Sequence, residues 1–144
     1  MKKLMYFVPS IIIMILIFVM SNDSSSGEKS DFITNTIWKI ITFITSYEPT
    51  LVNELGTSFI VRKIAHVSEY FILFISYSYG FFKSKIVMTQ KVIYLALIFT
   101  VLYAISDELH QSFIPNRVGT YEDVLIDSIG ALIAAAAILG NLER

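Results

Sequence analysis

The sequence predicts an all-α integral membrane protein, a bundle of four transmembrane helices plus one external amphipathic helix, in a single domain over residues 1–144. Its composition supports this: 55% of the 144 residues are hydrophobic and only 16% are charged, with a mean hydropathy of +0.66. Such values are typical of membrane proteins. Four apolar runs are close to the length that a bilayer requires. Between the first two runs, apolar residues recur with a helical period.

The first predicted span covers residues 4–20, directly after Lys2 and Lys3. At a rise of ~1.5 Å per residue it reaches ~26 Å, which nearly crosses a bilayer. A cleaved signal peptide begins in the same way, but the residues that follow Met20 contain no Ala-x-Ala-like cleavage site. We therefore expect a membrane anchor that is retained.

A flexible linker and an amphipathic helix are predicted next. Residues 21–27 are rich in Ser, Asn, Asp and Gly, which is typical of a linker. A helix over residues 32–46 follows, for which Ser30 or Asp31 is the expected cap and Pro49 the expected stop. This helix either lies in the membrane interface or packs on the outer end of the bundle. The isoleucines that share its apolar face are Ile33, Ile37, Ile40, Ile41 and Ile44.

Three further spans are predicted at residues 64–82, 92–106 and 124–142. The run at 92–106 is the shortest, and its boundaries are the least well defined by the sequence. The last run contains small residues at the spacing that lets membrane helices approach closely. These residues are Gly130, Ala131, Ala134 and Ala135.

The distribution of basic residues predicts that both termini are cytoplasmic. This orientation places six of the eleven basic residues inside, and three of them, Lys83, Lys85 and Lys91, fall in one short loop. The six are Lys2, Lys3, Lys83, Lys85, Lys91 and Arg144. We therefore expect a multi-pass protein of a bacterial cell membrane, with the amphipathic helix outside.

Ionisable residues cluster at the external ends of the last three spans, where burial in a membrane would be costly. Helical spacing places Arg62, His66 and Glu69 on one face, and it likewise groups the polar residues of the third and fourth spans. We interpret the cluster as a functional site; the alternative is that these residues only join helices by hydrogen bonds near the membrane boundary. The candidate catalytic residues are His66, Glu69, Asp107 and His110. The candidate binding residues are Arg62, Lys63, Glu108, Gln111, Arg117, Asp123 and Asp127.

Several function classes are excluded or disfavoured. The chain has no cysteine, which excludes disulfides, thiolate metal sites and a cysteine nucleophile. It has no basic cluster large enough to follow a phosphate backbone, so we expect no nucleic-acid partner. The G-x-S-x-G, P-loop and H-E-x-x-H signatures are also absent.

Three ordered motifs resemble the VanZ-like family of bacterial membrane proteins. They are Arg62-Lys63-x-x-His66-x-x-Glu69-Tyr70, Asp107-Glu108-x-His110-Gln111-x-Phe113-x-Pro115-x-Arg117 and Asp123-Val124-x-Ile126-Asp127-x-x-Gly130-Ala131. The resemblance covers most of the chain, and one departure is Asn116, where the family usually has glycine. It implies a role in the cell envelope, because the founding member is associated with teicoplanin resistance.

Two hypotheses for the function remain open. In the first, the external pocket binds a membrane lipid head group or a lipid-linked cell-wall intermediate, with Arg62, Lys63 and Arg117 as anion contacts, and so modulates teicoplanin susceptibility. In the second, the protein is an integral-membrane hydrolase of a phosphorylated or ester lipid. That enzyme would use either a histidine or a metal held by imidazoles and carboxylates. Transport is a third reading, for which so thin a bundle would have to form an oligomer. The sequence identifies neither a metal nor another cofactor.

Overall fold

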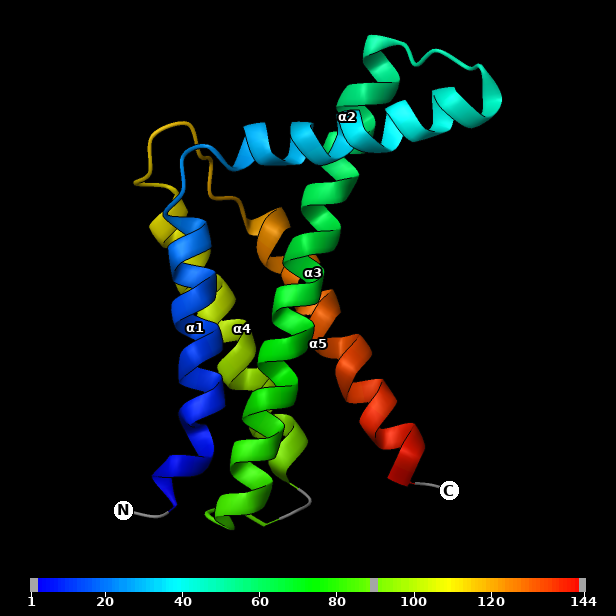
Figure 1. Ribbon diagram of the computed structural model, residues 1–144. Helices are drawn as coiled ribbons and strands as arrows, with labels where there is room; N and C mark the ends of the chain where they lie inside the picture. The colour runs from blue at the N-terminus through cyan, green and yellow to red at the C-terminus, as the bar shows by residue number, and fades with distance from the viewer. Residues whose placement is uncertain (1–2, 89–90, 143–144) are drawn as a thin grey trace.

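The computed structural model describes residues 3–88 and 91–142, and these residues form helices joined by short turns, with no strand among them (Figure 1). The all-α prediction is therefore confirmed. Lys2 and Arg144, which contribute to the orientation prediction, lie outside the described residues. The helices are a short 3-10 helix η1 (Leu4–Phe7), α1 (Val8–Ser21), α2 (Ser26–Thr45), α3 (Leu51–Ser84), α4 (Val92–Gln111) and α5 (Tyr121–Leu142).

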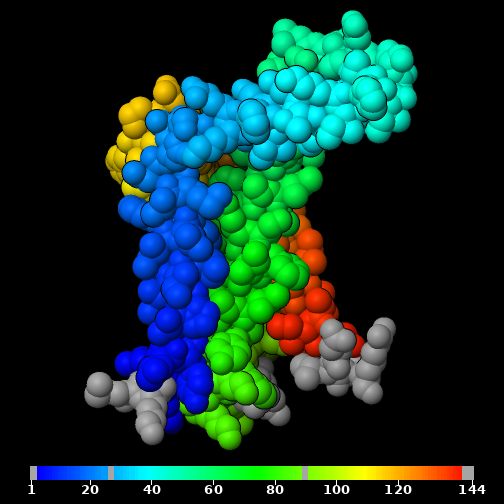
Figure 2. Space-filling model, viewed as in Figure 1, coloured from blue at the N-terminus to red at the C-terminus, as the bar shows by residue number. Residues whose placement is uncertain are grey.

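Four helices form an elongated bundle, and the fifth lies across one end of it. Helices α1, α3, α4 and α5 run along the bundle, whereas α2 crosses its end, and the α2–α3 connection projects beyond the bundle (Figures 1 and 2). The described chain begins and ends at the opposite end, where the α3–α4 turn also lies (Figure 1). We call the end of the bundle that lies beneath α2, formed by residues 20–23, 61–70 and 107–127, the α2 end.

Three of these helices are long and apolar enough to cross a membrane: Leu4–Ser21, Val92–Gln111 and Tyr121–Gly140. Within the described residues α3 is not among them, although the sequence predicts a span at 64–82. This helix carries Ser, Tyr, His and Glu side chains along that stretch. It also contacts each of the other four α-helices, so protein surrounds much of it. A helix that faces protein tolerates polar side chains that lipid would not.

Helix α2 starts earlier than the sequence predicts, so the predicted caps Ser30 and Asp31 are wrong and the linker before it is shorter. Ser25 precedes the helix, and its backbone N–H and hydroxyl donate to the Asp23 carboxylate at 2.9 and 2.6 Å. This local turn competes successfully with a cap farther along the chain. The helix ends at Thr45, because Ser46 adopts the left-handed conformation with φ of 57°.

Helices α3 and α4 are both longer than predicted. Helix α3 begins at Leu51 with a capping box in which Thr50 and Asn53 bond each other's backbone N–H groups at 3.4 and 3.0 Å. The residues between 51 and 63 mix polar and apolar types, so hydropathy alone does not reveal that they are helical. Helix α4 continues past the predicted end at 106 to Gln111. Its polar residues therefore have helical geometry.

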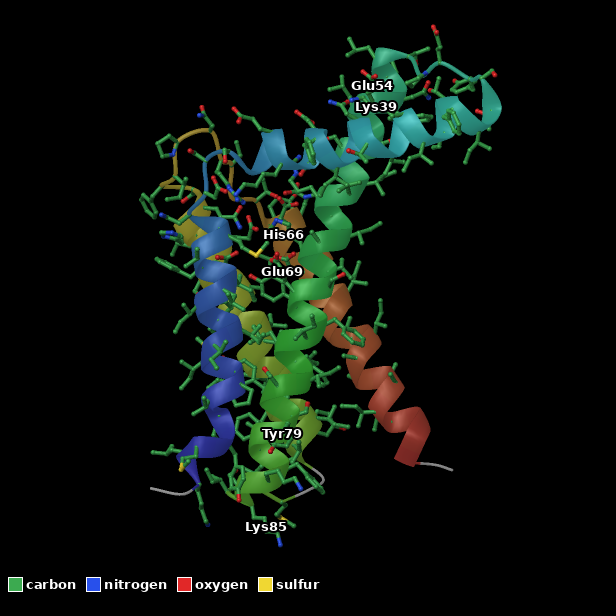
Figure 3. All side chains as sticks on the ribbon, in the orientation of Figure 1. Lys39, Glu54, His66, Glu69, Tyr79 and Lys85 are labelled. Carbon is green, nitrogen blue, oxygen red and sulfur yellow. The ribbon has the colours of Figure 1, made fainter. Side chains whose placement is uncertain are left out.

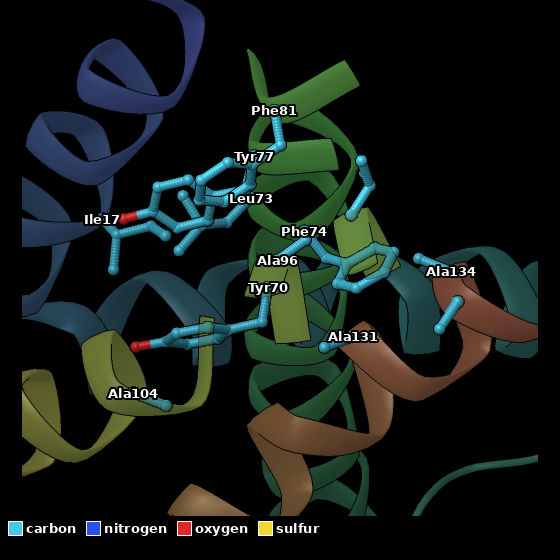
Figure 4. Packing of buried hydrophobic residues seen from close by; sticks show 12 residues of the cluster. Ile17, Tyr70, Leu73, Phe74, Tyr77, Phe81, Ala96, Ala104, Ala131 and Ala134 are labelled. Carbon is cyan, nitrogen blue, oxygen red and sulfur yellow. The ribbon is translucent and has the colours of Figure 1, made fainter. Parts of the chain in front are cut away.

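The core forms where aromatic side chains of α3 meet small residues of α4 and α5. Tyr70 and Phe74 are fully buried, and they lie among alanines of the neighbouring helices (Figure 4). Gly130 marks the closest approach: a Cβ atom there would lie 2.1 Å from the Val67 carbonyl oxygen. Only glycine lets α3 and α5 cross at this distance. The alanines are Ala96, Ala104, Ala131 and Ala134.

The outer surface of the bundle is apolar. Exposed residues on α1 include Ile11 and Ile15, and those on α5 include Leu132 and Ile133. Helix α2 contacts α3 and yet leaves Phe43 89% exposed. Apolar patches of this extent are rare on soluble monomers and are expected where lipid is the solvent.

Candidate functional site

Buried polar residues gather at the α2 end. Asp107, Glu108 and Gln111 of α4 and Asp127 of α5 are each no more than 4% exposed. Helix α3 brings His66 and Glu69 to the same region, below α2 (Figure 3). Buried carboxylates are costly unless partners compensate them, so each contact in this region bears on the function.

Asp107 anchors a hydrogen-bond network between α3 and α4. The Tyr70 hydroxyl donates to Asp107 Oδ2 at 3.2 Å, and Gln111 Nε2 donates to the same oxygen at 2.9 Å. Gln111 Nε2 also donates to Glu108 Oε1 at 3.2 Å. One amide thus holds two carboxylates of α4 side by side, since residues three and four apart share a helix face.

Arg117, in the α4–α5 loop, is engaged by the protein itself. Its Nη2 donates to the carbonyls of Met20 at 2.7 Å and Asp23 at 3.1 Å, its Nε donates to the Asp23 carbonyl at 3.2 Å, and its Nη1 donates to Gln111 Oε1 at 3.0 Å. The guanidinium therefore joins the C-terminal end of α1 and the residues just after it to the α4–α5 loop. Burial lowers the pKa of Arg117, while Asp107 raises it. The sequence predicts an anion contact here, whereas in the structure the side chain joins α1 to the loop.

The same loop is fitted closely to α4. Asn116 has φ of 63°, a left-handed conformation that Asn tolerates better than most residues. A Cβ atom on Gly119 would lie 1.9 Å from the Glu108 carbonyl oxygen, so that position requires glycine. The Thr120 N–H donates to Glu108 Oε2 at 3.0 Å. These contacts fix the loop over the carboxylates.

His66, Glu108 and Asp127 converge from three helices. His66 Nδ1 lies 3.4 Å from Asp127 Oδ1. Each of the three residues offers one ligand atom, and these three atoms lie within 4.8 Å of one another. Among the described residues, this is the group that could hold a metal ion. The motif spacing places each residue on its helix, and the helix packing brings them together.

Three predicted site residues are placed differently. Lys63 forms an ion pair with Asp123, and its ammonium lies 5.1 Å from the centre of the Phe59 ring. The charges of Lys63 and Asp123 therefore neutralise each other. Neither side chain lines either of the two cavities below α2 that are described next. His110 stacks on Phe18 of α1 with ring centres 4.7 Å apart, so its imidazole lies outside the group around Asp127.

Two cavities, of about 330 and 440 Å³, lie below α2 and share Arg62, His66 and Arg117 in their walls. The smaller one reaches Glu69 and Asp107 and is otherwise largely apolar. In the part of the chain that the structure describes, Arg62 makes no hydrogen bond or ion pair, although it lies beside both cavities. Its guanidinium is thus available to a ligand.

The basic residues around Arg62 are occupied. Lys29 pairs with the Asp23 carboxylate, and this hydrogen bond holds the pKa of Asp23 well below its usual range. Lys63 and Arg117 have the partners described above. Among the lysines and arginines in the walls of the two cavities, Arg62 is therefore the one without a bonded partner in the described structure.

Sequence reasoning missed two contributors to the site. Tyr70 supplies a hydrogen bond to Asp107, and its position next to Glu69 in the first motif was the available signal. Asp23 contributes its carbonyl to Arg117 and its carboxylate to Lys29, but it lies in a segment that reads as a flexible linker.

A comparison with protein families finds that the VanZ/LLP1 family profile matches residues 6–141. This range includes every helix that contributes to the site. No curated protein and no solved structure matches the chain.

Proposed function

The chain belongs to the VanZ/LLP1 family, and from this premise we propose that its smaller cavity binds the head group of an amine-bearing phospholipid. The observation that carries the proposal is Arg62, an uncompensated guanidinium beside a cavity that also contains carboxylates. The cavity volume of about 330 Å³ falls within the range of ligand pockets, roughly 300–1,000 Å³.

We propose further that the chain crosses the membrane four times, with α3 as the central span and α2 on the external surface. Helices α1, α3, α4 and α5 each run along the bundle, and both ends of the described chain lie at the same end of it (Figure 1). An even number of membrane crossings, such as four, would give this arrangement. Lys83 and Lys85 lie at that end, which would be cytoplasmic by the distribution of basic residues. The proposed site then faces the outer leaflet.

Arg62 is the proposed phosphate contact. A guanidinium offers a planar pair of N–H donors that matches the oxygens of a phosphate. One available guanidinium suits the single negative charge of a phosphodiester better than the higher charge of a pyrophosphate. An anion would also compensate Arg62, which has no partner within the described chain.

Glu69 and Asp107 are the proposed amine contacts. Both line the same cavity as Arg62, and acidic residues outnumber available basic residues there. A purely anionic ligand would be repelled by these carboxylates, whereas an ammonium group would compensate them. Apolar residues of the same cavity, Ile17 and Val61, would contact the first carbons of the acyl chains.

The test measures lipid binding by the full-length protein in a mild detergent. Phosphatidylethanolamine, phosphatidylglycerol and diacylglycerol are titrated separately, and bound lipid is counted by native mass spectrometry. We expect phosphatidylethanolamine to bind most tightly and diacylglycerol most weakly. Arg62→Gln should weaken both phospholipids at least about tenfold, because a charge-assisted hydrogen bond contributes about 1.5–3 kcal/mol. Glu69→Gln should weaken phosphatidylethanolamine selectively.

Lys39→Gln is the matched control, since Lys39 is an exposed basic residue on α2 that does not line either cavity. Equal binding by the native protein, Arg62→Gln and Lys39→Gln would contradict the proposed site. An equal loss of lipid binding in Arg62→Gln and Lys39→Gln would show that lipid binding depends only on the charge of the protein surface, and it would also contradict the proposed site.

The family resemblance leads us to propose that occupation of this cavity also modulates teicoplanin susceptibility. A sensitive host expressing the native chain should show changed susceptibility, and one expressing Arg62→Gln at the same membrane level should not. If both chains have the same effect, the cavity is not responsible, and if neither has any, the resistance analogy fails.

A further inference from the structure

The group formed by His66, Glu108 and Asp127 has a charge imbalance that the protein does not resolve. Four carboxylates, of Glu69, Asp107, Glu108 and Asp127, lie close together at the α2 end, whereas the guanidinium of Arg117 is the cation bonded into their network. Lys63 is paired with Asp123, outside this group. An excess of buried negative charge is costly unless a cation enters from solution.

Asp127 is the residue that needs such a cation most. Its side chain is 1% exposed, and in the described chain neither carboxylate oxygen accepts a hydrogen bond. A buried polar atom without a partner is rare in native proteins and calls for an explanation. The nearest candidate partner, His66 Nδ1, is 3.4 Å from Oδ1 and is itself without a hydrogen bond.

We propose that His66, Glu108 and Asp127 bind one divalent transition-metal ion. Two ligand atoms that each lie ~2.1 Å from a tetrahedral ion are ~3.4 Å apart. The distance between His66 Nδ1 and Asp127 Oδ1 has this value. It is long for a hydrogen bond and suitable for two ligands of a shared ion.

Glu108 is the third ligand, and a small movement of its side chain would bring its oxygen within the ~4.2 Å that separates two ligands of one ion at most. Its ligand oxygen lies within 4.8 Å of those of His66 and Asp127. Gln111 and the Thr120 N–H hold its two oxygens by hydrogen bonds, and these are the outer contacts that orient a ligating carboxylate.

The donor set indicates which ions the site takes. One imidazole and two carboxylates suit Zn²⁺ or Mn²⁺, whereas Ca²⁺ and Mg²⁺ prefer oxygen ligands alone. Three protein ligands leave a coordination position open. Because His66 also lines both cavities, the ion would lie beside the proposed phosphate site. The metal site does not depend on the lipid proposal. It would provide the metal held by imidazole and carboxylate ligands that one form of the hydrolase hypothesis requires.

The test uses full-length protein purified in detergent with an affinity tag that contains no histidine. After chelator treatment, the protein is dialysed to equilibrium against Zn²⁺, and its metal content is measured by plasma mass spectrometry. We expect about one Zn²⁺ per chain. His66→Gln and Asp127→Asn should each weaken binding at least about tenfold, because even loss of an outer contact costs 10–100-fold.

The chain offers two matched controls. His110→Gln changes the other histidine, which stacks on Phe18, and Asp123→Asn changes the carboxylate one turn before Asp127. Both should keep native metal content. Size-exclusion profiles and helical circular dichroism show that each variant is folded, and the Co²⁺-loaded native protein should show a visible absorption band that both ligand variants lose.

Absence of bound Zn²⁺ from the native protein after this dialysis would overturn the proposal and leave a simple His66–Asp127 ion pair. Metal binding that the folded ligand variants retain would also overturn it. Either result is independent of the lipid titration, since that experiment depends on Arg62, which is not one of the proposed metal ligands.

Discussion

Gly130→Ala tests the close crossing of α3 and α5 that positions Asp127. A Cβ atom at residue 130 would lie 2.1 Å from the Val67 carbonyl oxygen and 2.9 Å from the Phe71 backbone nitrogen. Ordinary contact begins near 3.4 Å, so the helices must separate by about 1.3 Å. Neither obstacle is a side chain that could rotate away. The added methyl group therefore displaces backbone.

The expected cost follows from this displacement. Overpacking of a tight core lowers the free energy of unfolding by about 1–3 kcal/mol. For a chain of this size that corresponds to a fall in Tm of roughly 2–12 °C. Because Gly130 is three residues after Asp127, the shift also lengthens the 3.4 Å separation from His66. Zn²⁺ binding should weaken in parallel with stability.

The assay is thermal unfolding of the full-length protein in mild detergent, followed by circular dichroism. Gly140→Ala is the control, because it makes the same substitution on the same helix with no atom within 4 Å of the new Cβ. Helix propensity favours alanine in both variants by about 0.5–1 kcal/mol, so their difference isolates the clash. Equal Tm values for the two variants would refute the close crossing.

Three further predictions concern the α2 end and the topology. Arg117→Lys should lower the free energy of unfolding by roughly 1.5–3 kcal/mol in chemical denaturation, because one ammonium cannot reach the Met20 carbonyl, the Asp23 carbonyl and Gln111 together. A variant as stable as the native protein would contradict this role. The hydrogen bond from Lys29 lowers the pKa of Asp23, so ionised Asp23 stabilises the fold above the unfolded pKa of about 3.9 and loses that effect as the pH falls. The Tm advantage of the native protein over Asp23→Asn should therefore be present at neutral pH and shrink on acidification, and a constant difference would be contrary evidence. Since the chain lacks cysteine, Tyr47→Cys should react with an impermeant maleimide on intact cells and Lys85→Cys only after permeabilisation; the reverse pattern would invert the bundle.

The sequence is sufficient to predict the helical class, the apolar character of α1, α4 and α5, and the gathering of His66 and Asp127 with the α4 carboxylates. Hydropathy and helical spacing determine these features directly. Helix ends were less accurate, because they depend on local bonds. The Asp23 turn and the Thr50 capping box each move a boundary by several residues.

Partner choice among polar side chains could not be predicted. Spacing places His110 near Asp107, but packing turns its ring onto Phe18. An arginine such as Arg117 could bind an anion, yet in the structure its guanidinium donates to the Met20 and Asp23 carbonyls. The partner that a polar side chain bonds depends on which helices pack beside it. The sequence of a single helix does not contain that information.

The measurement that tests the proposed function most directly is photocrosslinking with a phosphatidylethanolamine that carries a diazirine near its head group. The crosslinked residues are identified by mass spectrometry of the full-length protein. Our account predicts labels on Ile17, Val61 and Ala65, which line the cavity, and their loss in Arg62→Gln but not in Lys39→Gln. Labels confined to the outward-facing Leu132 and Ile133, and unchanged by Arg62→Gln, would contradict it.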